Sequence, residues 1–352
     1  MQDNFLKVVE LSTEGLVLKR FMAPLAAYLY GHGAHSVRCV NGATLSMRRT
    51  ISPFWDLVVL VRCWWLFRRW KPDVLHVHTA KAGAIGRLVA WLAGVPRVIY
   101  TAHDFPFHGD LSPFRQRLYA WIERHLATLC QAITVDSAAV RNRAVFRNVV
   151  PMRKLHIIPV GVDTARFDPD LYHVLAKHSD VIVGMVGRLV PEKGLDLLID
   201  AIARIETSSL IPCRVMIVGA GSQQEELKRF ARHVNIQAWF VGEVEDVRNY
   251  LAQMDVFALP THREGLSVAV MEAMSMAKPV LVSALPAFQE LVIDNETGIL
   301  VHSDEWVAKL TMVLKSSALR QRLGLAARAH VQKYYEQSAS NRAYERLLVG
   351  PR

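Results

Sequence analysis

The chain has 352 residues, of which 51% are hydrophobic and 21% are charged, which excludes a disordered protein and suits two globular domains of ordinary size. The formal net charge is +10, but residues 1–160 carry 21 Lys and Arg against 9 Asp and Glu, whereas the remainder carries 21 against 23. All of the basic excess therefore lies in the first half, which points to an anionic partner there.

Four cysteines are scattered singly along the chain, with no CxxC pair: Cys39, Cys63, Cys130 and Cys213. This spacing gives no framework for zinc or disulfides and suits a reducing compartment. The first apolar run is interrupted by Lys7 and Glu10 before it reaches the length of a signal peptide. We therefore expect a cytoplasmic protein.

Short apolar runs alternate with longer amphipathic stretches through the first half of the chain. The runs expected to form strands are residues 5–11, 36–40, 73–78, 97–101, 132–135 and 155–158. Residues 16–30, 82–93 and 114–129 are expected to be helical. Such alternation predicts a parallel sheet with helices on both faces.

A further helix is expected over residues 54–70, in strongly basic surroundings. Between residues 48 and 71 the cations are Arg48, Arg49, Arg62, Arg68, Arg69 and Lys71, and the acidic residue is Asp56. Apolar positions recur at helical spacing, namely Phe54, Leu57, Val58, Val61, Trp64 and Trp65. The run is too short and too charged to span a bilayer, but tryptophans flanked by arginines indicate an interfacial helix on an anionic membrane surface.

Two alternatives compete with a membrane surface. The apolar stripe could instead pack on the sheet, because helical periodicity alone does not separate core from lipid contact. A nucleic-acid-binding protein would also be basic, but the sequence has no helix-turn-helix, RRM-like or zinc-finger pattern and no basic strip with interleaved aromatics. We expect no nucleic-acid partner.

The second half repeats the alternation of strands and helices. Its expected strands are residues 181–187, 214–218, 238–241, 256–259, 280–283 and 298–301. The rhythm breaks over residues 160–179. The sequence therefore predicts an α/β protein with two doubly wound, Rossmann-like domains, over residues 1–165 and 180–330. Because ligands bind beyond the carboxyl ends of parallel strands, two such domains facing each other across a cleft would hold one ligand between them.

Candidate ligand groups follow the strands of the second half. The loop Gly187-Arg188-Leu-Val-Pro-Glu-Lys193-Gly194 carries two cations that can neutralise a diphosphate. The next strand leads to Val218-Gly219-Ala-Gly221, which lacks the third glycine of a dinucleotide fingerprint and suits a turn.

Two carboxylates, Glu264 and Glu272, form the strongest candidate pair. Gly265 lets the backbone approach a ligand closely, and Ser267 can cap a helix over residues 268–276 whose N-terminus would accept anions. At a helical rise of ~1.5 Å per residue the carboxylates would lie ~12 Å apart, so that each could hold a different part of one elongated ligand.

In this order and spacing, these motifs together with Asn295-Glu296-Thr297-Gly298 resemble the C-terminal half of retaining GT-B glycosyltransferases of family four, over residues 181–301. The resemblance implies that Arg188 and Lys193 hold the donor diphosphate, that Glu264 faces the transferred sugar and that Glu272 grips the ribose hydroxyls. It also implies nucleotide-sugar contacts at Gly15, Gly187, Gly219, Gly265, Leu266 and Ser267. In such enzymes a C-terminal helix often crosses back onto the first domain, which we expect of residues 331–352.

The first half resembles the acceptor domains of bacterial family-four enzymes that extend lipid-diphosphate-linked sugars for capsule, O-antigen, exopolysaccharide or protein glycosylation. The resemblance rests on His76-Val-His78-Thr-Ala-Lys81-Ala-Gly83 and on Tyr100-Thr-Ala-His103. It implies that His103 lies near the transferred sugar and that His78 and Lys81 contact the acceptor or a phosphate. A buried capping histidine is the alternative for His103.

This half also departs from the family pattern in two places. These enzymes usually read His-Gly-Phe where the chain has His103-Asp104-Phe105, and the glycine-rich loop after the first strand is reduced to Thr13-Glu14-Gly15. Both departures bear on acceptor specificity.

The function implied by the resemblance is retaining transfer of a hexose or N-acetylhexosamine from a UDP- or GDP-sugar to a polyprenyl-diphosphate-linked glycan at the inner face of the cell membrane. No metal or other cofactor is expected. His76 and His78 share a strand face, but no cysteine or carboxylate pattern completes a site, and Asp168-Pro-Asp170 is interpreted as an interdomain loop.

Two other functions stay open at the level of sequence. A GT-B sugar-nucleotide epimerase would share the fold and isomerise its nucleotide sugar without an acceptor. A non-catalytic binding protein, or a nucleic-acid binder, would show salt-dependent affinity for DNA without affinity for UDP or GDP.

Overall fold

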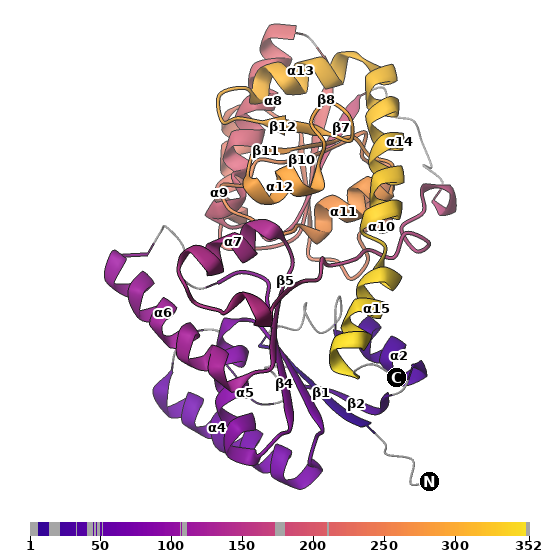
Figure 1. Cartoon of the computed structure of the whole chain (residues 1–352). Helices are drawn as coiled ribbons and strands as arrows, with labels where there is room; N and C mark the ends of the chain where they lie inside the picture. Colours follow the sequence, from indigo (N-terminus) through magenta and orange to yellow (C-terminus); the bar gives the residue numbers. More distant parts are fainter. Residues whose placement is uncertain are drawn as a thin grey trace. The chain divides into compact units, whose positions relative to one another are not determined.

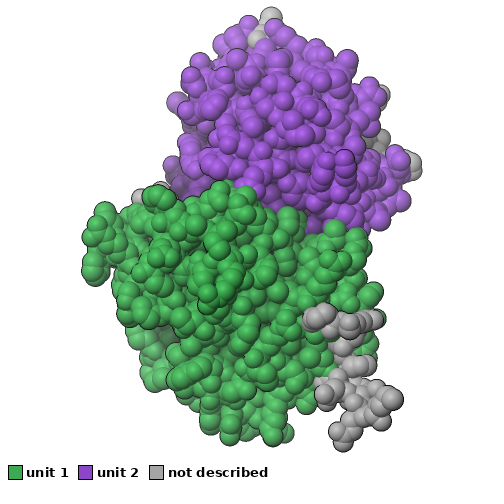
Figure 2. Space-filling model, in the orientation of Figure 1, with its two compact units in different colours: residues 1–160, 338–352 green, residues 161–337 purple. Residues whose placement is uncertain are grey.

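The computed structural model describes residues 6–13, 22–32, 34–40, 45, 47, 50, 52–105, 107, 111–172, 180–209 and 211–349. The chain divides into two compact units, coloured separately in Figure 2. Unit 1 comprises residues 1–160 and 338–352, and unit 2 comprises residues 161–337. The predicted boundaries are 165 and 330. The observed ones differ because residues 161–162 pack closely on residues 336–337, which places both stretches in unit 2: Val162 forms a bridge with Glu336, and a Cβ at Gly161 would lie 2.4 Å from the Cα of Gln337.

Unit 1 is built on a parallel six-stranded sheet with the order β2-β1-β3-β4-β5-β6 (Figure 1). Its strands are β1 (Leu6–Leu11), β2 (Ala34–Val40), β3 (Val74–His78), β4 (Arg97–Ala102), β5 (Ala132–Val135) and β6 (Leu155–Ile157). Its α-helices are α2 (Ala23–Gly31), α4 (Pro53–Trp70), α5 (Ala80–Ala93), α6 (Pro113–Leu126), α7 (Ala138–Phe146) and α15 (Gln337–Leu348). From β1 the chain goes to one side for β2 and to the other side for all later strands. The carboxyl ends of β1 and β3 therefore flank a topological switch point, where such sheets bind ligands.

Helices cover both faces of this sheet because apolar side chains alternate along each strand. On β1, Val9 and Leu11 belong to a core cluster with residues of α4, α5 and α6, whereas Val8 belongs to a cluster with residues of α2 and α15. Figure 1 shows these two groups of helices on opposite sides of the sheet. Glu10, two residues after Val8, therefore points to the face that α15 covers.

Helix α4 presents one face to the core and another to solvent. Its buried residues, spaced four apart, are Val59, Cys63 and Phe67. The predicted apolar stripe lies elsewhere on the helix, with Phe54 72%, Leu57 60% and Trp65 60% exposed. The alternative that this stripe packs on the sheet is therefore wrong for these side chains. No helix among the described residues has the length and apolar character needed to cross a membrane.

Unit 2 repeats the architecture with a second parallel six-stranded sheet, in the order β12-β11-β10-β7-β8-β9. Its strands are β7 (Val181–Val186), β8 (Cys213–Val218), β9 (Ala238–Gly242), β10 (Val256–Leu259), β11 (Val280–Ser283) and β12 (Ile299–Val301). Its α-helices are α8 (Leu195–Ser209), α9 (Gln224–His233), α10 (Arg248–Gln253), α11 (Val268–Ser275), α12 (Pro286–Leu291), α13 (Trp306–Lys315) and α14 (Ser317–Tyr334). The switch point of this sheet lies between β7 and β10.

The predicted α/β class with two doubly wound sheets is confirmed. Each predicted strand is present, and its described ends lie within two residues of the prediction. The first helix is predicted to begin at residue 16, which lies outside the described residues. In the structure, α2 begins at Ala23. The predicted helix over 114–129 divides into α6 and a 3-10 turn over Ala127–Leu129.

Candidate active site

Two loops of unit 2 meet at its switch point: residues 187–194 after β7 and residues 260–264 after β10. The hydroxyl of Thr261 and the amide of His262 both donate to the carbonyl oxygen of Glu192, over 2.6 and 2.8 Å. Gly194, at φ 62°, permits this approach, because a Cβ there would lie 2.2 Å from the carbonyl oxygen of Pro260. Tight packing of the loops thus brings the residues after β7 and β10 together.

Lys193 and Glu264 form the centre of this arrangement. The Lys193 ammonium makes an ion pair with the Glu264 carboxylate, and the two side chains are only 13% and 19% exposed. Arg188, on the first of the two loops, is exposed. An anionic ligand at this edge would therefore meet one cation held by a carboxylate and a second cation that faces solvent.

Gly187 and Gly219 pack backbone to backbone. Gly219 has φ 136°, and a Cβ there would lie 1.9 Å from the carbonyl oxygen of Gly187. The Gly187 amide donates to the Val218 carbonyl oxygen over 2.9 Å. The glycine pattern after β8 therefore allows the close approach of two loops, and the part these glycines take in nucleotide binding stays a prediction.

Glu272 lies on α11 and is buried. Because α11 begins at Val268, residues 264–267 are not helical, and the ~12 Å spacing, which assumes a continuous helix, does not apply. Ser267 occupies the N-cap position, but its side chain makes no capping hydrogen bond. Gly265 is partly buried, whereas Leu266 and Ser267 are buried. The chain thus turns from loop to helix between the two carboxylates.

In unit 1 the switch point carries Thr13 after β1 and Thr79 after β3, whose hydroxyl oxygens are 2.7 Å apart. Thr79 has φ 67° and ψ 152°, a region of backbone conformation that is almost restricted to glycine. Such strain costs of the order of 1–3 kcal/mol and clusters at functional sites. No residue pattern indicates this conformation, because threonine is not a residue type that favours it. The predicted contact residue Gly15 lies outside the described residues.

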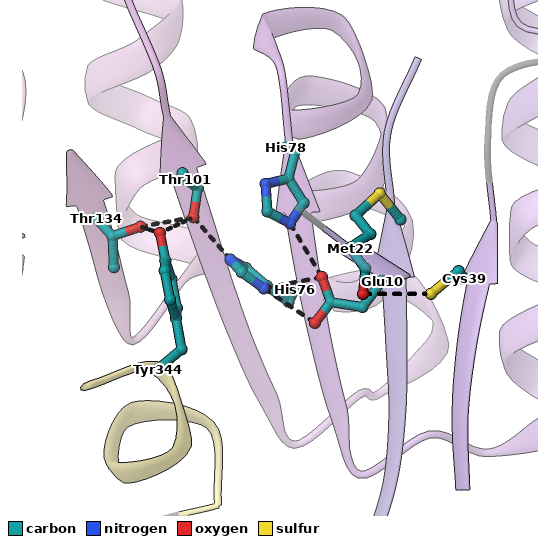
Figure 3. Close-up of polar contacts among 8 residues, drawn as sticks. All are labelled: Glu10, Met22, Cys39, His76, His78, Thr101, Thr134 and Tyr344. Carbon is teal, nitrogen blue, oxygen red and sulfur yellow. Dashed lines mark hydrogen bonds and ion pairs between the residues drawn. The ribbon is translucent and has the colours of Figure 1, made fainter. Parts of the chain in front are cut away.

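A buried polar cluster lies on the face of the unit 1 sheet that α15 covers (Figure 3). One carboxylate oxygen of Glu10, Oε2, lies 2.9 Å from Nδ1 of His76 and 2.9 Å from Nε2 of His78. The expectation that no carboxylate accompanies the two histidines is therefore wrong. Glu10 comes from β1, which pairs with β3 in the register that sets Glu10 beside His76, and pairing between separate strands is not visible in local spacing.

The charges in this cluster are set by burial and by neighbours. Burial alone would raise the pKa of Glu10, but the charge and hydrogen bonds of His76, followed by those of His78, outweigh it and lower the pKa to about 2. Burial lowers the pKa of His78 to about 3, and His76 acts in the same direction. At neutral pH, Glu10 is therefore an anion and His78 is a neutral imidazole.

The cluster continues to Tyr344 of α15. The second ring nitrogen of His76, Nε2, lies 2.7 Å from Oγ1 of Thr101, which lies 2.6 Å from Oγ1 of Thr134. The Tyr344 hydroxyl is 3.3 Å from both threonine hydroxyls. A helix from the end of the chain thus completes the polar face of a sheet formed by its beginning (Figure 3).

His103 follows β4 and is oriented by Asp136, which follows the neighbouring strand β5. The His103 Nδ1 lies 2.7 Å from Oδ2 of the buried Asp136, and 24% of the His103 side chain is exposed. The His78 ring stacks on the His103 ring with centroids 5.6 Å apart. Asp136 was missed from the sequence, although its place directly after an expected strand was an available signal.

Lys81, at the start of α5, is held by contacts from the α4 region. Its Nζ lies 2.6 Å from Oδ1 of Asp56 and donates to the carbonyl oxygen of Thr50 over 2.6 Å. An acceptor phosphate at Lys81 would therefore have to share this cation with Asp56.

One group among the described residues has donor atoms close enough to hold a metal ion: Glu10, His76 and His78, whose atoms all lie within 4.8 Å of one another. The Glu10 carboxylate already contacts one ring nitrogen of each histidine, so a metal ion would replace those contacts. Asp168 of the Asp-Pro-Asp sequence lies 2.9 Å from Arg328 and accepts from the Asp170 amide, as a residue that stabilises a turn.

Comparison with known proteins gives matches over both units. Residues 24–166 match the family described as Glycosyltransferase Family 4, and residues 173–330 match Glycosyl transferases group 1. A UDP-Gal:alpha-D-GlcNAc-diphosphoundecaprenol alpha-1,3-galactosyltransferase of Escherichia coli is 31% identical over 293 residues, which cover 80% of this chain and 74% of that protein. The capsular polysaccharide biosynthesis glycosyltransferase CapM of Staphylococcus aureus is 25% identical over 308 residues, with coverages of 83% and 80%.

Solved structures agree in fold. HepE of Anabaena in complex with UDP-glucose gives a TM-score of 0.79 at 18% identity, covering 98% of this chain and 100% of HepE. WaaG, a glycosyltransferase involved in lipopolysaccharide biosynthesis, gives a TM-score of 0.80 at 16% identity with the same coverages. Two parallel six-stranded sheets covered by helices are thus shared with these proteins.

Proposed function

The chain belongs to glycosyltransferase family 4 and has the GT-B fold, and from this premise we propose that it moves a hexose from a UDP-sugar to a polyprenyl-diphosphate-linked glycan with retention of anomeric configuration. A UDP-sugar donor is supported by the name of the Escherichia coli relative and by the UDP-glucose bound to HepE. A lipid-linked acceptor is supported by the name of the Escherichia coli relative, and a part in surface polysaccharide synthesis is supported by the name of CapM. UDP-galactose is the first donor to test.

The ion pair of Lys193 with Glu264 at the switch point of unit 2 is the observation that carries the proposal. In unit 2 we assign the diphosphate of the donor to Lys193 and Arg188, the transferred sugar to Glu264 and the ribose to Glu272. The backbone N–H groups of residues 265–267, before α11, add donors for phosphate at a helix N-terminus.

The chemistry that follows needs no protein base. The bond from the sugar C1 to the diphosphate oxygen breaks, and its electron pair stays on that oxygen. The acceptor hydroxyl oxygen forms the new bond to C1 on the same face, and its proton passes to the departing diphosphate. Lys193 and Arg188 stabilise the charge that develops on the leaving group, an effect for which removal of one donor costs about 10²–10³ in turnover.

Unit 1 is proposed to bind the acceptor. His103, oriented by Asp136, and Lys81, at the start of α5, are the groups assigned to it, with His78 stacked behind His103. The basic excess of residues 1–160 and the exposed apolar face of α4 support a peripheral location on the cytoplasmic face of the membrane, where a polyprenyl-linked acceptor is anchored.

The test is transfer from a panel of UDP- and GDP-sugars to a synthetic GlcNAc-diphosphate lipid, with the anomeric configuration of the product read by NMR. We expect an α-linked product from an α-configured UDP-hexose. Glu264→Gln should lose transfer, whereas the matched surface variant Glu226→Gln on α9 should keep it. An inverted product, or isomerisation of the donor without acceptor, would contradict the proposal.

We also propose that the reaction needs no divalent cation. Charge on the leaving diphosphate is assigned to Lys193 and Arg188, and Asp168 and Asp170 are engaged in a turn. Turnover in excess EDTA should match turnover in magnesium. Activity that vanished in EDTA and returned with manganese would overturn this assignment.

A further inference from the structure

Unit 1 contains a pocket of about 500 Å³ between the edge strand β2 and helix α4. Its lining residues are Arg38, Cys39, Val40, Leu45, Arg62, Trp65, Leu66 and Arg69. The volume lies within the range of small-ligand sites, which is ~300–1,000 Å³. Three of the described lining residues are arginines, and none of the described ones carries a carboxylate. The pocket therefore combines apolar walls with guanidinium groups, which favours an amphipathic anion.

Two of the three arginines stack on indole rings. The guanidinium of Arg38 lies 4.6 Å from the ring centroid of Trp70, and that of Arg69 lies 5.4 Å from the ring centroid of Trp65. Stacking on an aromatic face restrains a guanidinium without removing its charge, and a planar guanidinium fork matches phosphate oxygens. Asp56 is the one acidic residue in the α4 sequence, and it pairs with Lys81 at 2.6 Å.

The exposed apolar face of α4 adjoins this pocket through Trp65. Its most exposed members, Phe54, Leu57, Val61 and Trp65, are between 54% and 72% exposed. Trp65 belongs both to this face and to the pocket wall. An anion in the pocket that carried acyl chains could therefore place those chains along the exposed side of the helix.

We propose that this pocket binds the phosphate of an anionic phospholipid head group, with the exposed face of α4 lying in the interfacial layer of the membrane. The proposal rests on the proposed function only in that a membrane-anchored acceptor gives the contact its use. Through the pair of Asp56 with Lys81, the same helix holds a residue assigned to the acceptor. Lipid contact at α4 would thus bring unit 1 to the surface that carries its substrate.

The first experiment is sedimentation of the full chain with vesicles of phosphatidylcholine alone and with added phosphatidylglycerol. We expect binding only with the anionic lipid. The double variant Arg38→Gln with Arg69→Gln should weaken it by tenfold or more, since each cation near an anionic surface contributes ~1 kcal/mol. The control, Arg229→Gln with Arg232→Gln on exposed positions of α9 in unit 2, removes the same charge and should change it by less than about threefold. Equal losses of vesicle binding in both double variants would show that binding depends only on net charge and would overturn the proposal.

A second arm separates the head group from free phosphate. A short-chain phosphatidylglycerol below its micellar concentration should bind at one site by calorimetry, and the pocket variant should lose this binding. Inorganic phosphate should bind at least about tenfold more weakly, because it cannot use the apolar wall. Equal affinities for phosphate and lipid would overturn the proposal. Leu57→Glu with Val61→Glu should abolish vesicle binding, and unchanged binding there would also contradict it.

A third experiment, a transfer assay with two acceptors, distinguishes failure of this inference from failure of the proposed function. Transfer to a water-soluble acceptor should be the same in the wild type and in the pocket variant, whereas transfer to a polyprenyl acceptor in anionic vesicles should fall with membrane binding. Loss of transfer to the soluble acceptor in the pocket variant would assign the pocket to the acceptor diphosphate and overturn the lipid assignment. Absence of transfer by the wild type to either acceptor would instead refute the proposed function.

Discussion

Units 1 and 2 share one architecture but assemble their candidate residues in different ways. In unit 2, Lys193 and Glu264 follow two neighbouring strands, each within its own sequence motif, and tight packing of two loops joins them. In unit 1, Glu10, His76 and Tyr344 come from two strands and from the last helix, and no motif contains all three. The nucleotide-sugar half is thus specified by local motifs, whereas the other half depends on strand register and on the end of the chain.

The largest expected effect lies in unit 2. Lys193→Ala removes a cation assigned to the leaving diphosphate and should lower kcat by about 10²–10³ while leaving the fold intact. Steady-state kinetics with saturating donor measures this change. Lys228→Ala, on the surface of α9, is the matched control and should keep wild-type turnover. A Lys193 variant with near-normal kcat would show that the local motif does not carry the chemistry.

Glu10→Gln tests whether the unit 1 cluster is structural. Removing the charge between two buried histidines should destabilise unit 1 by about 2–4 kcal/mol, because it breaks a buried hydrogen-bonded pair. Hydrogen exchange of β3 amides measures this loss, and UDP affinity should stay unchanged because the donor is assigned to unit 2. The exposed Glu225→Gln should leave exchange in β3 unaltered. Weakened UDP binding without faster amide exchange in β3 would contradict the assignment of the donor to unit 2.

The pH dependence of unit 1 should follow the same cluster. The pKa of His78 is lowered from 6.5 to about 3, so the unfolded chain binds a proton that the folded chain does not, and stability falls as pH decreases from 6.5 towards 3. Glu10, with its pKa lowered from 4.5 to about 2, adds to this loss as pH decreases below 4.5.

Each group contributes at most about 1.4 kcal/mol per pH unit to this slope. Urea unfolding of unit 1 between pH 7 and pH 4, followed through β3 amide exchange, measures it. His78→Gln should flatten the slope, whereas His233→Gln, at an exposed position of α9, should retain it. An unchanged slope in the His78 variant would show that acid sensitivity arises elsewhere.

The smallest effect is expected from the contact of the C-terminal helix. Tyr344→Phe removes one hydroxyl that lies 3.3 Å from Thr101 and Thr134 but keeps the ring, so unit 1 should lose about 1 kcal/mol. The change should appear as faster amide exchange in α15. Tyr334→Phe, at an exposed position of α14, should have no effect on α15. A loss above about 3 kcal/mol would show that the ring position also depends on the hydroxyl.

The fold could be predicted because its signals are local. Alternating apolar runs predict the strands, and the motifs after β7 and β10 each contain one of the two residues, Lys193 and Glu264, that form the ion pair. The sequence does not show which side of α4 faces the core, because Phe54 on the exposed side and Val59 on the buried side are both apolar and only packing distinguishes them.

The parts that could not be predicted depend on the tertiary structure. Glu10 joins His76 through the register of two strands, and Asp136 orients His103 across neighbouring strand ends. The strained backbone of Thr79 and the pairing of Lys81 with Asp56 are also set by contacts between distant segments. A spacing rule along one chain contains none of this information.

The central claim is that the two glutamates after β10 have separate tasks in sugar transfer, and parallel measurement of UDP affinity and turnover in Glu264→Gln and Glu272→Gln tests it most directly. Glu264→Gln should bind UDP within about threefold of wild type while kcat falls by about 10² or more. Glu272→Gln should weaken UDP binding about tenfold with a smaller change in kcat at saturating donor. Wild-type turnover in Glu264→Gln, or equal losses of affinity and turnover in both variants, would contradict the account.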